Sequence, residues 1–370
     1  MKVCLIAPIP PFRGGISKYC YSLAQEIEKR HDLLLLSYRR QYPAVLYGNK
    51  NQIDSTYDRA TIMGEFRNLS YEIDSINIAS WIKTAKAIVL FRPDIVILPW
   101  WVAYWAPMYA WLMRYLKKRG IKCLLICINV FEHEDSAAKK ILSKFVLRRT
   151  DLMVVHSQQE MDQLLEINDK AIIRKQFLPP FCYDNPLLPR ANSSFHLLFF
   201  GFIRHYKGLD ILLQALARLR YNDIFLKIVG EFWDGKEECL SLIKELNISG
   251  QVEIIDRYVA DNEMGGYFSW ADVVVLPYRA SKTSGVIATA YGHGRPVLAT
   301  DVGGFHEVVQ DGYTGKLVRA GDPQAIADGI AWFYENRRVD FEKNIASFVA
   351  QHMSWGSMVN TIEDMVVHAQ

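Results

Sequence analysis

The 370-residue sequence is half apolar and 22% charged, which is typical of a globular chain and excludes a disordered one, and its length predicts two domains. The formal net charge of +3 comes without a nucleic-acid-binding motif, so we expect no nucleic-acid partner. The six cysteines lack zinc-ligand spacing, and no signal peptide is recognised, which predicts reduced thiols, no metal site and a cytoplasmic protein.

The chain opens with a predicted strand that leads to a glycine pair. The apolar run Lys2–Ala7 is followed by a proline-rich loop and then by Gly14 and Gly15. From Ile16 onward, apolar residues recur with helical spacing. Free N–H groups and the dipole at such a helix start favour an anion, although a turn that needs positive φ explains the glycines equally well.

Further strands are predicted at 33–37, 95–99, 121–128 and 153–156. Residues 38–78 have weak periodicity, and a stretch of this length is usually functional or partly structured. Residues 100–111 hold four of the nine tryptophans, which suit either core packing or an acceptor or membrane surface.

The charge is unevenly distributed along the chain. Residues 1–185 carry a net charge of +8 and residues 186–370 a net charge of −5, which favours an anionic surface or ligand on one side. The excess is concentrated near a helix that we expect Ser136 to cap, where lysines and arginines flank an apolar stripe. This helix presents either a solvated basic face or a contact with anionic lipid headgroups, and the second case would place the protein on the inner face of the cell membrane.

The proline-rich stretch 179–190 predicts a linker, after which the strand–helix pattern restarts at Leu197. We therefore expect a first domain at 1–185 and a second at 186–354. Each predicted loop follows a parallel strand, so the two doubly wound α/β domains should face a central cleft.

The most informative stretch is 271–304. A buried strand, 271–276, ends at Pro277, and a polar loop leads to a short helix that begins at Ser284-Gly285. The backbone N–H groups of Ser284, Gly285 and Val286 predict a phosphate site at the helix start.

Several motifs together resemble a known family. They are Gly14-Gly15, the GFIRHYKG loop at 201–208, VGE ending at Glu231, ADVVVLPY at 271–278 and the block SG…GRPVLATDVGG ending at 304. In this order they resemble the retaining, nucleotide-sugar-dependent glycosyltransferases of family 4, which belong to group 1 and have the GT-B fold. The resemblance implies a nucleotide-diphosphate sugar as co-substrate, no other cofactor, and a saccharide or lipid-linked acceptor. It also implies that a final helix, about 355–370, crosses back to the first domain.

The resemblance assigns roles to individual residues. Lys207 and, from a shifted position, Arg204 would meet the charge of the departing diphosphate in place of a metal ion. His133 would lie near the reacting sugar. Glu231, Tyr258 and Val259 resemble the edge that binds the nucleoside.

The sequence departs from the family at two positions. Thr289 stands where the family has the glutamate that binds the ribose, and Ser281 stands where a second glutamate lies near the donor sugar. A threonine hydroxyl can still bond a ribose, and Arg279, Lys282 and Thr283 offer further contacts. We therefore expect a retaining, metal-independent hexosyltransferase of cell-surface polysaccharide or glycolipid synthesis. A non-catalytic GT-B binding partner and a nucleotide-sugar epimerase remain as alternatives.

Overall fold

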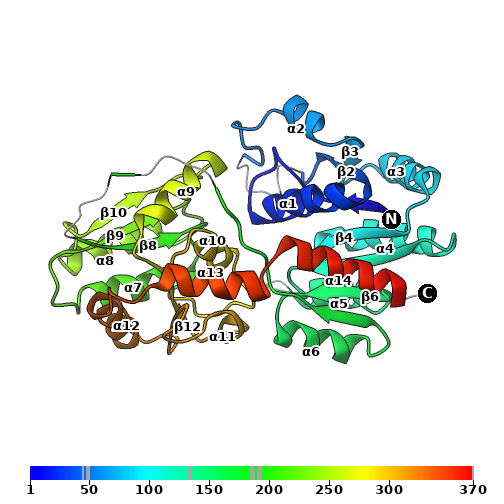
Figure 1. Ribbon diagram of the computed structural model, residues 1–370. Coiled ribbons are helices and arrows are strands. Elements are labelled where there is room, and N and C mark those ends of the chain that lie inside the picture. The colour runs from blue at the N-terminus through cyan, green and yellow to red at the C-terminus, as the bar shows by residue number, and fades with distance from the viewer. Residues whose placement is uncertain (44–45, 47–50, 132–135, 184–187, 190–193, 369–370) are drawn as a thin grey trace. The chain divides into compact units, whose positions relative to one another are not determined.

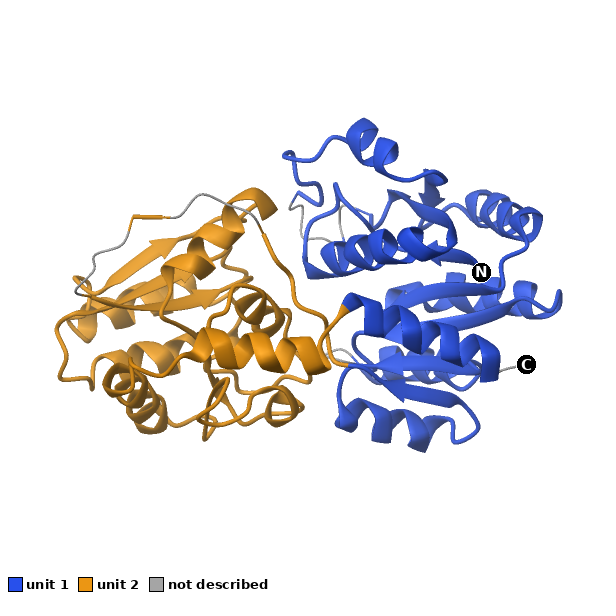
Figure 2. Ribbon diagram, in the orientation of Figure 1, with its two compact units in different colours: residues 1–176, 355–370 blue, residues 177–354 orange. Residues whose placement is uncertain are grey.

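The structure, a computed structural model, describes residues 1–370 apart from 44–45, 47–50, 132–135, 184–187, 190–193 and 369–370. His133 lies outside the described residues. The chain forms two compact units: unit 1 contains 1–176 and 355–370, and unit 2 contains 177–354 (Figure 2). The chain therefore leaves unit 1 after Gln176, somewhat before the boundary expected from its prolines.

Unit 1 is built on a seven-stranded sheet in the order β3-β2-β1-β4-β5-β6-β7, with every pairing parallel (Figure 1). The strands are β1 (Lys2–Ile6), β2 (Asp32–Arg40), β3 (Leu69–Asp74), β4 (Ile95–Trp100), β5 (Lys122–Cys127), β6 (Leu152–Val155) and β7 (Ile172–Lys175). The helices are α1 (Gly15–Arg30), α2 (Arg59–Glu65), α3 (Ile78–Phe91), the 3-10 turn η2 (Ala103–Trp105), α4 (Ala106–Lys117), α5 (Ala137–Leu147), α6 (Gln158–Ile167) and α14 (Trp355–His368).

Unit 2 repeats this plan with a six-stranded parallel sheet in the order β10-β9-β8-β11-β12-β13. Its strands are β8 (Phe195–Phe200), β9 (Ile224–Val229), β10 (Val252–Ile255), β11 (Val273–Leu276), β12 (Val297–Thr300) and β13 (Gly315–Val318). Its helices are the 3-10 turn η3 (His205–Lys207), α7 (Leu209–Leu216), α8 (Lys236–Glu245), α9 (Asp261–Trp270), α10 (Gly285–Gly292), α11 (Phe305–Val308), α12 (Pro323–Glu335) and α13 (Phe341–His352).

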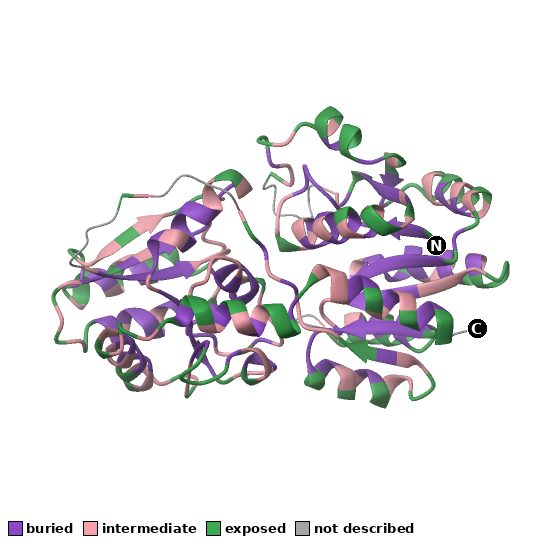
Figure 3. Cartoon of the chain, in the orientation of Figure 1, coloured by how far each residue is buried: buried purple, intermediate pink, exposed green. Residues whose placement is uncertain are grey.

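The central strands are continuous apolar runs because helices cover both faces of such sheets. All six residues of β4 and all four of β11 are buried, whereas the outer faces of the helices are exposed (Figure 3). Capping side chains mark several helix starts, and the one at Ser136 is as predicted. The side chain of Ser136 accepts a hydrogen bond from Lys139 N at the start of α5, and Asp322 caps α12 in the same way.

The stretch 38–78 contains more regular structure than its sequence pattern indicates. It includes the end of β2, the helix α2 and the strand β3, which lies at the edge of the sheet. Only the last two residues of β3 are buried, so its sequence, LSYEID, shows little apolar alternation. Edge position thus explains why this strand escapes a reading based on hydrophobic pattern.

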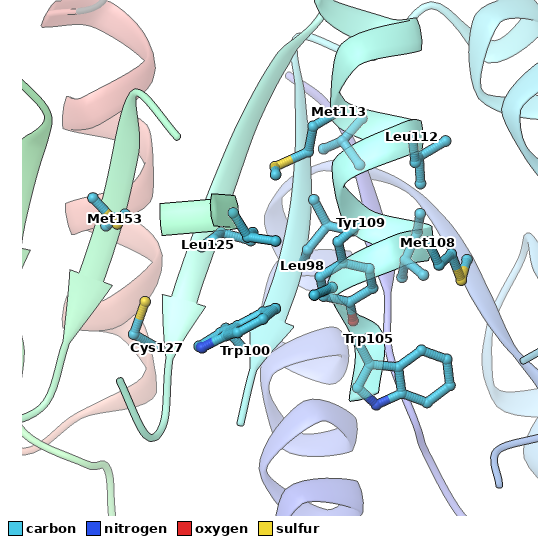
Figure 4. Packing of buried hydrophobic residues seen from close by; sticks show 14 of the residues in the cluster. Leu98, Trp100, Trp105, Met108, Tyr109, Leu112, Met113, Leu125, Cys127 and Met153 are labelled. Atoms are coloured by element: carbon cyan, nitrogen blue, oxygen red, sulfur yellow. The ribbon is translucent and has the colours of Figure 1, made fainter. Parts of the chain in front are cut away.

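Two of the tryptophans in 100–111 belong to the core of unit 1. Trp100 and Trp105 are each 1% exposed and pack with Tyr109 and Leu98 (Figure 4). Trp101 and Trp111 are only partly buried. Core packing therefore accounts for half of this aromatic stretch, and Trp100 and Trp105 are not available to a membrane or an acceptor.

The last described helix, α14, packs against α1. Tyr19 lies on α1 with its ring 5.3 Å from the Trp355 ring, and its hydroxyl donates to Met358 Sδ over 3.9 Å. The carboxylate of Glu363 lies 2.9 Å from Arg30 and 2.7 Å from His31. The C-terminal segment is therefore an integral part of unit 1.

Candidate functional site

The candidate site lies in unit 2, where the strand order reverses. β8 is followed along the chain by β9 on one side, and β11 begins the other side, so β8 and β11 form the switch point of the sheet. In open parallel sheets, ligands bind at the carboxyl ends of the strands beside such a point. The loop 201–208 follows β8 and the loop 277–284 follows β11, so both begin at this edge.

These two loops are pressed together. Gly208 has φ 68°, and a Cβ there would lie 2.1 Å from the carbonyl oxygen of Pro277. The backbone N–H of Arg279 donates to the carbonyl of Tyr206 over 2.7 Å. Only glycine allows both this left-handed conformation and such a close approach of the two backbones. The approach brings Arg204 and Lys207 of the first loop towards the loop 277–284.

Lys207 occupies the junction of the two loops and is 7% exposed. Its Nζ donates to the carbonyl of Phe200, at the end of β8, over 3.3 Å, and it lies 5.4 Å from the centre of the Tyr278 ring, just after β11. The position that a Cβ on Gly201 would occupy is within 4 Å of both Lys207 Nζ and Val286 Cγ2. The ammonium group is therefore close to the first turn of α10.

Burial lowers the pKa of Lys207 from its ordinary 10.5 to about 7, and the positive charge of Arg204 acts in the same direction. The unliganded environment therefore disfavours the charged amine. An anion placed here would restore favourable electrostatics to the ammonium, which is the behaviour expected of a phosphate-binding lysine.

An ion pair holds the two loops together near Lys207. The guanidinium of Arg279 donates to both carboxylate oxygens of Asp210 over 2.8 and 2.6 Å, and also to the carbonyl of His205 over 2.9 Å. Partial burial acts to raise the pKa of Asp210, but the hydrogen bonds and charge of Arg279 leave it below its ordinary value. Arg279, expected above to offer a donor contact, is thus engaged in holding the two loops together.

The start of α10 carries the three predicted backbone donors, and one of them is engaged by the helix cap. Ser284 is the N-cap, and its hydroxyl accepts a hydrogen bond from Val286 N over 3.2 Å. Gly285, the first residue of the helix, is exposed. The cap therefore engages the N–H of Val286, and the N–H groups of Ser284 and Gly285, together with the positive end of the dipole, suit this helix start to an anion.

The two positions that depart from the family are engaged within the protein. Thr289 is 5% exposed, and its hydroxyl donates to the carbonyl of Gly285 over 2.8 Å. The hydroxyl of Ser281 donates to the carbonyl of Thr283 over 2.9 Å. Neither hydroxyl proton is available to a ribose or a sugar in this structure.

The remaining predicted donor residues lie on neighbouring loops. Arg204 precedes Lys207, with its guanidinium carbon 4.4 Å from the centre of the Trp233 ring. Glu231 follows β9, and its carbonyl accepts a hydrogen bond from Ile203 N over 2.9 Å. Tyr258 and Val259 follow β10, and Val259 is buried. All these segments follow the carboxyl ends of adjacent strands, which brings them to one edge of the sheet.

Gly14 and Gly15 form a second helix start of the same kind, in unit 1. Gly14 has φ 101° and precedes α1, which begins at Gly15. A Cβ at either glycine would have no atom within 4 Å, so the space beside this helix start is open. They follow β1, which lies beside β4 at the switch point of the unit 1 sheet.

Sequence reasoning missed two contributors: Asp210, the partner of Arg279, and Trp233, which lies beneath Arg204. Both act across loops that are far apart in sequence, and no local pattern marks such pairs. Among the described residues, no group of three or more His, Cys, Asp or Glu side chains is arranged to hold a metal ion.

Each of the two doubly wound parallel-sheet units has an anion-favouring helix start at its switch point, and the solved structures that share this fold are GT-B glycosyltransferases. Among solved structures, Anabaena HepE in complex with UDP and glucose matches with a TM-score of 0.76 and 15% identity, covering 100% of both chains. The sucrose-phosphate synthase of Thermosynechococcus elongatus matches with a TM-score of 0.75 and 17% identity, again over 100% of both chains. At these identities the likeness shows the fold.

Sequence models supply the family. The model of glycosyl transferases group 1 matches residues 194–336, and that of glycosyltransferase family 4 matches residues 13–173. The D-inositol 3-phosphate glycosyltransferase of Corynebacterium urealyticum is 28% identical over 258 residues, which are 64% of this chain and 60% of the relative. That of Pseudarthrobacter chlorophenolicus is 34% identical over 170 residues, which are 44% of this chain and 40% of the relative, so the chain spans only part of these curated relatives. The chain belongs to the group 1, family 4 glycosyltransferases.

Proposed function

We propose that this protein transfers a hexose from a nucleotide-diphosphate sugar to a saccharide or lipid-linked acceptor, with retention of configuration and without a metal ion. The observation that carries the proposal is the buried ammonium of Lys207 beside the first turn of α10. HepE of Anabaena was solved with UDP and with UDP-glucose, which supports a nucleotide sugar as donor. A structural neighbour at 15% identity, a lipopolysaccharide outer core galactosyltransferase, supports a cell-surface polysaccharide or glycolipid as the product.

The chemistry follows from the charge that develops on the leaving group. When the bond between the anomeric carbon and the β-phosphate oxygen breaks, negative charge accumulates on the diphosphate. Lys207, Arg204 and the N–H groups at the start of α10 would stabilise that charge. The acceptor oxygen would form its bond to the anomeric carbon on the same face, and its proton would pass to the departing phosphate oxygen.

The other predicted residues would position the substrates. The nucleoside would lie against the segments of Glu231, Tyr258 and Val259. His133 would hydrogen-bond the donor sugar, and the helix start at Gly14-Gly15 would offer a further anion contact.

A panel of nucleotide sugars tests the proposal directly. We expect one of them to be hydrolysed or transferred, with the α or β configuration of the product read by NMR and with activity that survives EDTA. Lys207→Ala and Arg204→Ala should each remove most of the activity. Unchanged activity in both variants would contradict the role given to these cations, and loss on chelation would contradict the metal-free mechanism.

One observation favours the non-catalytic alternative. Thr289 and Ser281 replace two carboxylates of the family, and both hydroxyls are bonded to backbone carbonyls. Thermal shift combined with the turnover assay separates the two cases, because a specific ligand raises the melting temperature by mass action whether or not it is turned over. Stabilisation by a nucleoside diphosphate with no turnover of any nucleotide sugar would favour a binding protein.

We further propose that α5 places the protein on the inner face of the cell membrane. Ile141, Leu142 and Phe145 are exposed on this helix, at 68, 43 and 46%, while Val146 and Leu147 face the core. Among the described residues no helix has the length and apolarity needed to span a bilayer, so any attachment through this helix would be at the surface. Lys140, Lys144, Arg148 and Arg149 are exposed on the same helix or just after it, which suits anionic headgroups.

Vesicle sedimentation tests this attachment. We expect more binding to vesicles with phosphatidylglycerol than to phosphatidylcholine alone, and loss of that binding when Ile141 and Phe145 are both replaced by serine. Leu90→Ser is the matched control, since Leu90 is 86% exposed on α3. Equal sedimentation with both kinds of vesicle would remove the proposal.

A further inference from the structure

Arg204 lies against an aromatic side chain from a different loop. Its guanidinium carbon is 4.4 Å from the centre of the Trp233 ring, a geometry typical of a cation–π interaction. Trp233 is on the segment between β9 and α8, 29 residues after Arg204 in the sequence. The contact therefore joins the loop that carries Lys207 to the neighbouring loop.

Backbone contacts fix the place of Trp233. Its N–H donates to the carbonyl of Ile203 over 3.0 Å, and Ile203 and Phe232 form a parallel bridge. Gly230 has φ 144°, and a Cβ there would lie 2.1 Å from the carbonyl oxygen of Gly201. The two loops therefore run side by side from Gly201 onward, and the indole of Trp233 lies beneath Arg204.

The second aromatic contact of Trp233 comes from Phe202. The two ring centres are 5.2 Å apart, and Phe202 also lies 6.4 Å from the ring of Tyr258. Phe202 lies on the same loop as Arg204, two residues before it. The indole of Trp233 therefore packs against both Phe202 and Arg204.

The charge distribution explains why such a support is needed. Arg204 is close enough to Lys207 to lower the pKa of that amine, so the two cations repel each other. Without a counter-charge, an arginine side chain that is only partly buried would turn away from a second cation. The face of the indole offers an attraction that offsets this repulsion until an anion binds.

We propose that Trp233 is a positioning residue that holds the guanidinium of Arg204 beside Lys207, so that both cations are in place for the diphosphate of the donor. The inference rests on the proposed function, because it takes the diphosphate as the ligand of these cations. It predicts that Trp233 acts through Arg204 and has little effect on binding by itself.

A double-mutant cycle measures this dependence. The full-length protein and its variants are titrated calorimetrically with UDP, GDP and ADP, and the diphosphate that binds best to the wild type is used throughout. Trp233→Leu keeps an apolar group but removes the π face, and we expect it to weaken binding about five- to tenfold. Trp233→Phe keeps a π face and should stay within about twofold of the wild type. In an Arg204→Ala background, Trp233→Leu should cost less than about twofold, because there is no guanidinium left to hold.

The cycle also separates the outcomes. Equal losses from Trp233→Leu with and without Arg204 would overturn the proposal, because the indole would then act only by packing the loops. An unchanged affinity in Trp233→Leu would overturn it as well. Should the wild type bind none of the three diphosphates, the proposed function itself fails and this inference with it. If Trp233→Leu proves unstable, Trp233→Met in both backgrounds gives the same comparison, because methionine also fills the space without a π face.

Discussion

Replacing Lys207 by methionine should make the protein more stable in acid while it removes nucleotide binding. Lys207 is 7% exposed, and burial lowers its pKa to about 7 in the folded chain. Between pH 7 and its ordinary pKa of 10.5, the amine is protonated in the unfolded chain and largely neutral in the folded one. Unfolding therefore takes up a proton in this window, so the stability of the wild type rises with pH and the cost of the buried charge is fully present below about pH 6.

The size of the effect follows from the same values. A fall in pKa from 10.5 to about 7 corresponds to roughly 5 kcal/mol, at about 1.4 kcal/mol per pH unit. Methionine removes that cost, but it leaves the carbonyl of Phe200 without the donor that Nζ supplies, which costs about 1–3 kcal/mol. We expect a net gain of about 2–4 kcal/mol at pH 6, or roughly 4–16 °C in the melting temperature of a unit of this size.

Differential scanning calorimetry of the full chain at pH 6, 8 and 10 checks this reasoning. The advantage of Lys207→Met should be largest at pH 6 and should disappear towards pH 10. Lys244→Met is the control, because Lys244 is an exposed lysine on α8 of the same unit. A difference in melting temperature that does not change with pH, or a variant that is less stable at pH 6, would refute the argument.

Three further predictions concern the same edge of the sheet. Gly208→Ala should lower the free energy of unfolding, measured by urea titration, by at least about 3 kcal/mol. Gly235→Ala is the control: Gly235 has φ 69° but no atom within 4 Å of the position of a Cβ, so this substitution should cost about 1 kcal/mol. Asp210→Asn should cost only about 1 kcal/mol, since its pair with Arg279 is about one-third exposed, and the loss should appear mainly as weaker nucleotide binding by calorimetry. Thr289→Val should change nucleotide affinity by less than about threefold, because the hydroxyl proton is already bonded within α10, and a larger loss would restore its role at the ribose.

Much of the fold could be predicted because its signals are local. The strand and helix at 271–292, and the helix that begins after Asp322, follow from apolar runs and capping residues. β3 was not recognised, since an edge strand with mostly half-exposed side chains has no strong pattern. The apolar stripe of α5 was recognised, but its spacing alone does not tell which residues face the core, and the structure leaves Ile141 and Phe145 outside.

The site, like the fold, has parts that local sequence predicts and parts that depend on distant contacts. The helix start at Ser284 and the cation at Lys207 follow from short motifs in the sequence. The burial of Lys207, the pairing of Arg279 with Asp210 and the stacking of Arg204 on Trp233 depend on contacts between separate loops. Such contacts arise from the order of strands in the sheet, which residue spacing does not encode.

The packing of α14 on α1 has a consequence for biosynthesis. Unit 2 is a continuous segment, 177–354, whereas unit 1 needs both 1–176 and 355–370. Unit 1 cannot complete its packing until α14 has been made, because Met358, Ile362 and Met365 are all buried in the finished protein. Termination of synthesis near residue 354 would therefore give a chain with all of unit 2 but with unit 1 lacking its α14, which would leave unit 1 exposed to quality-control proteases.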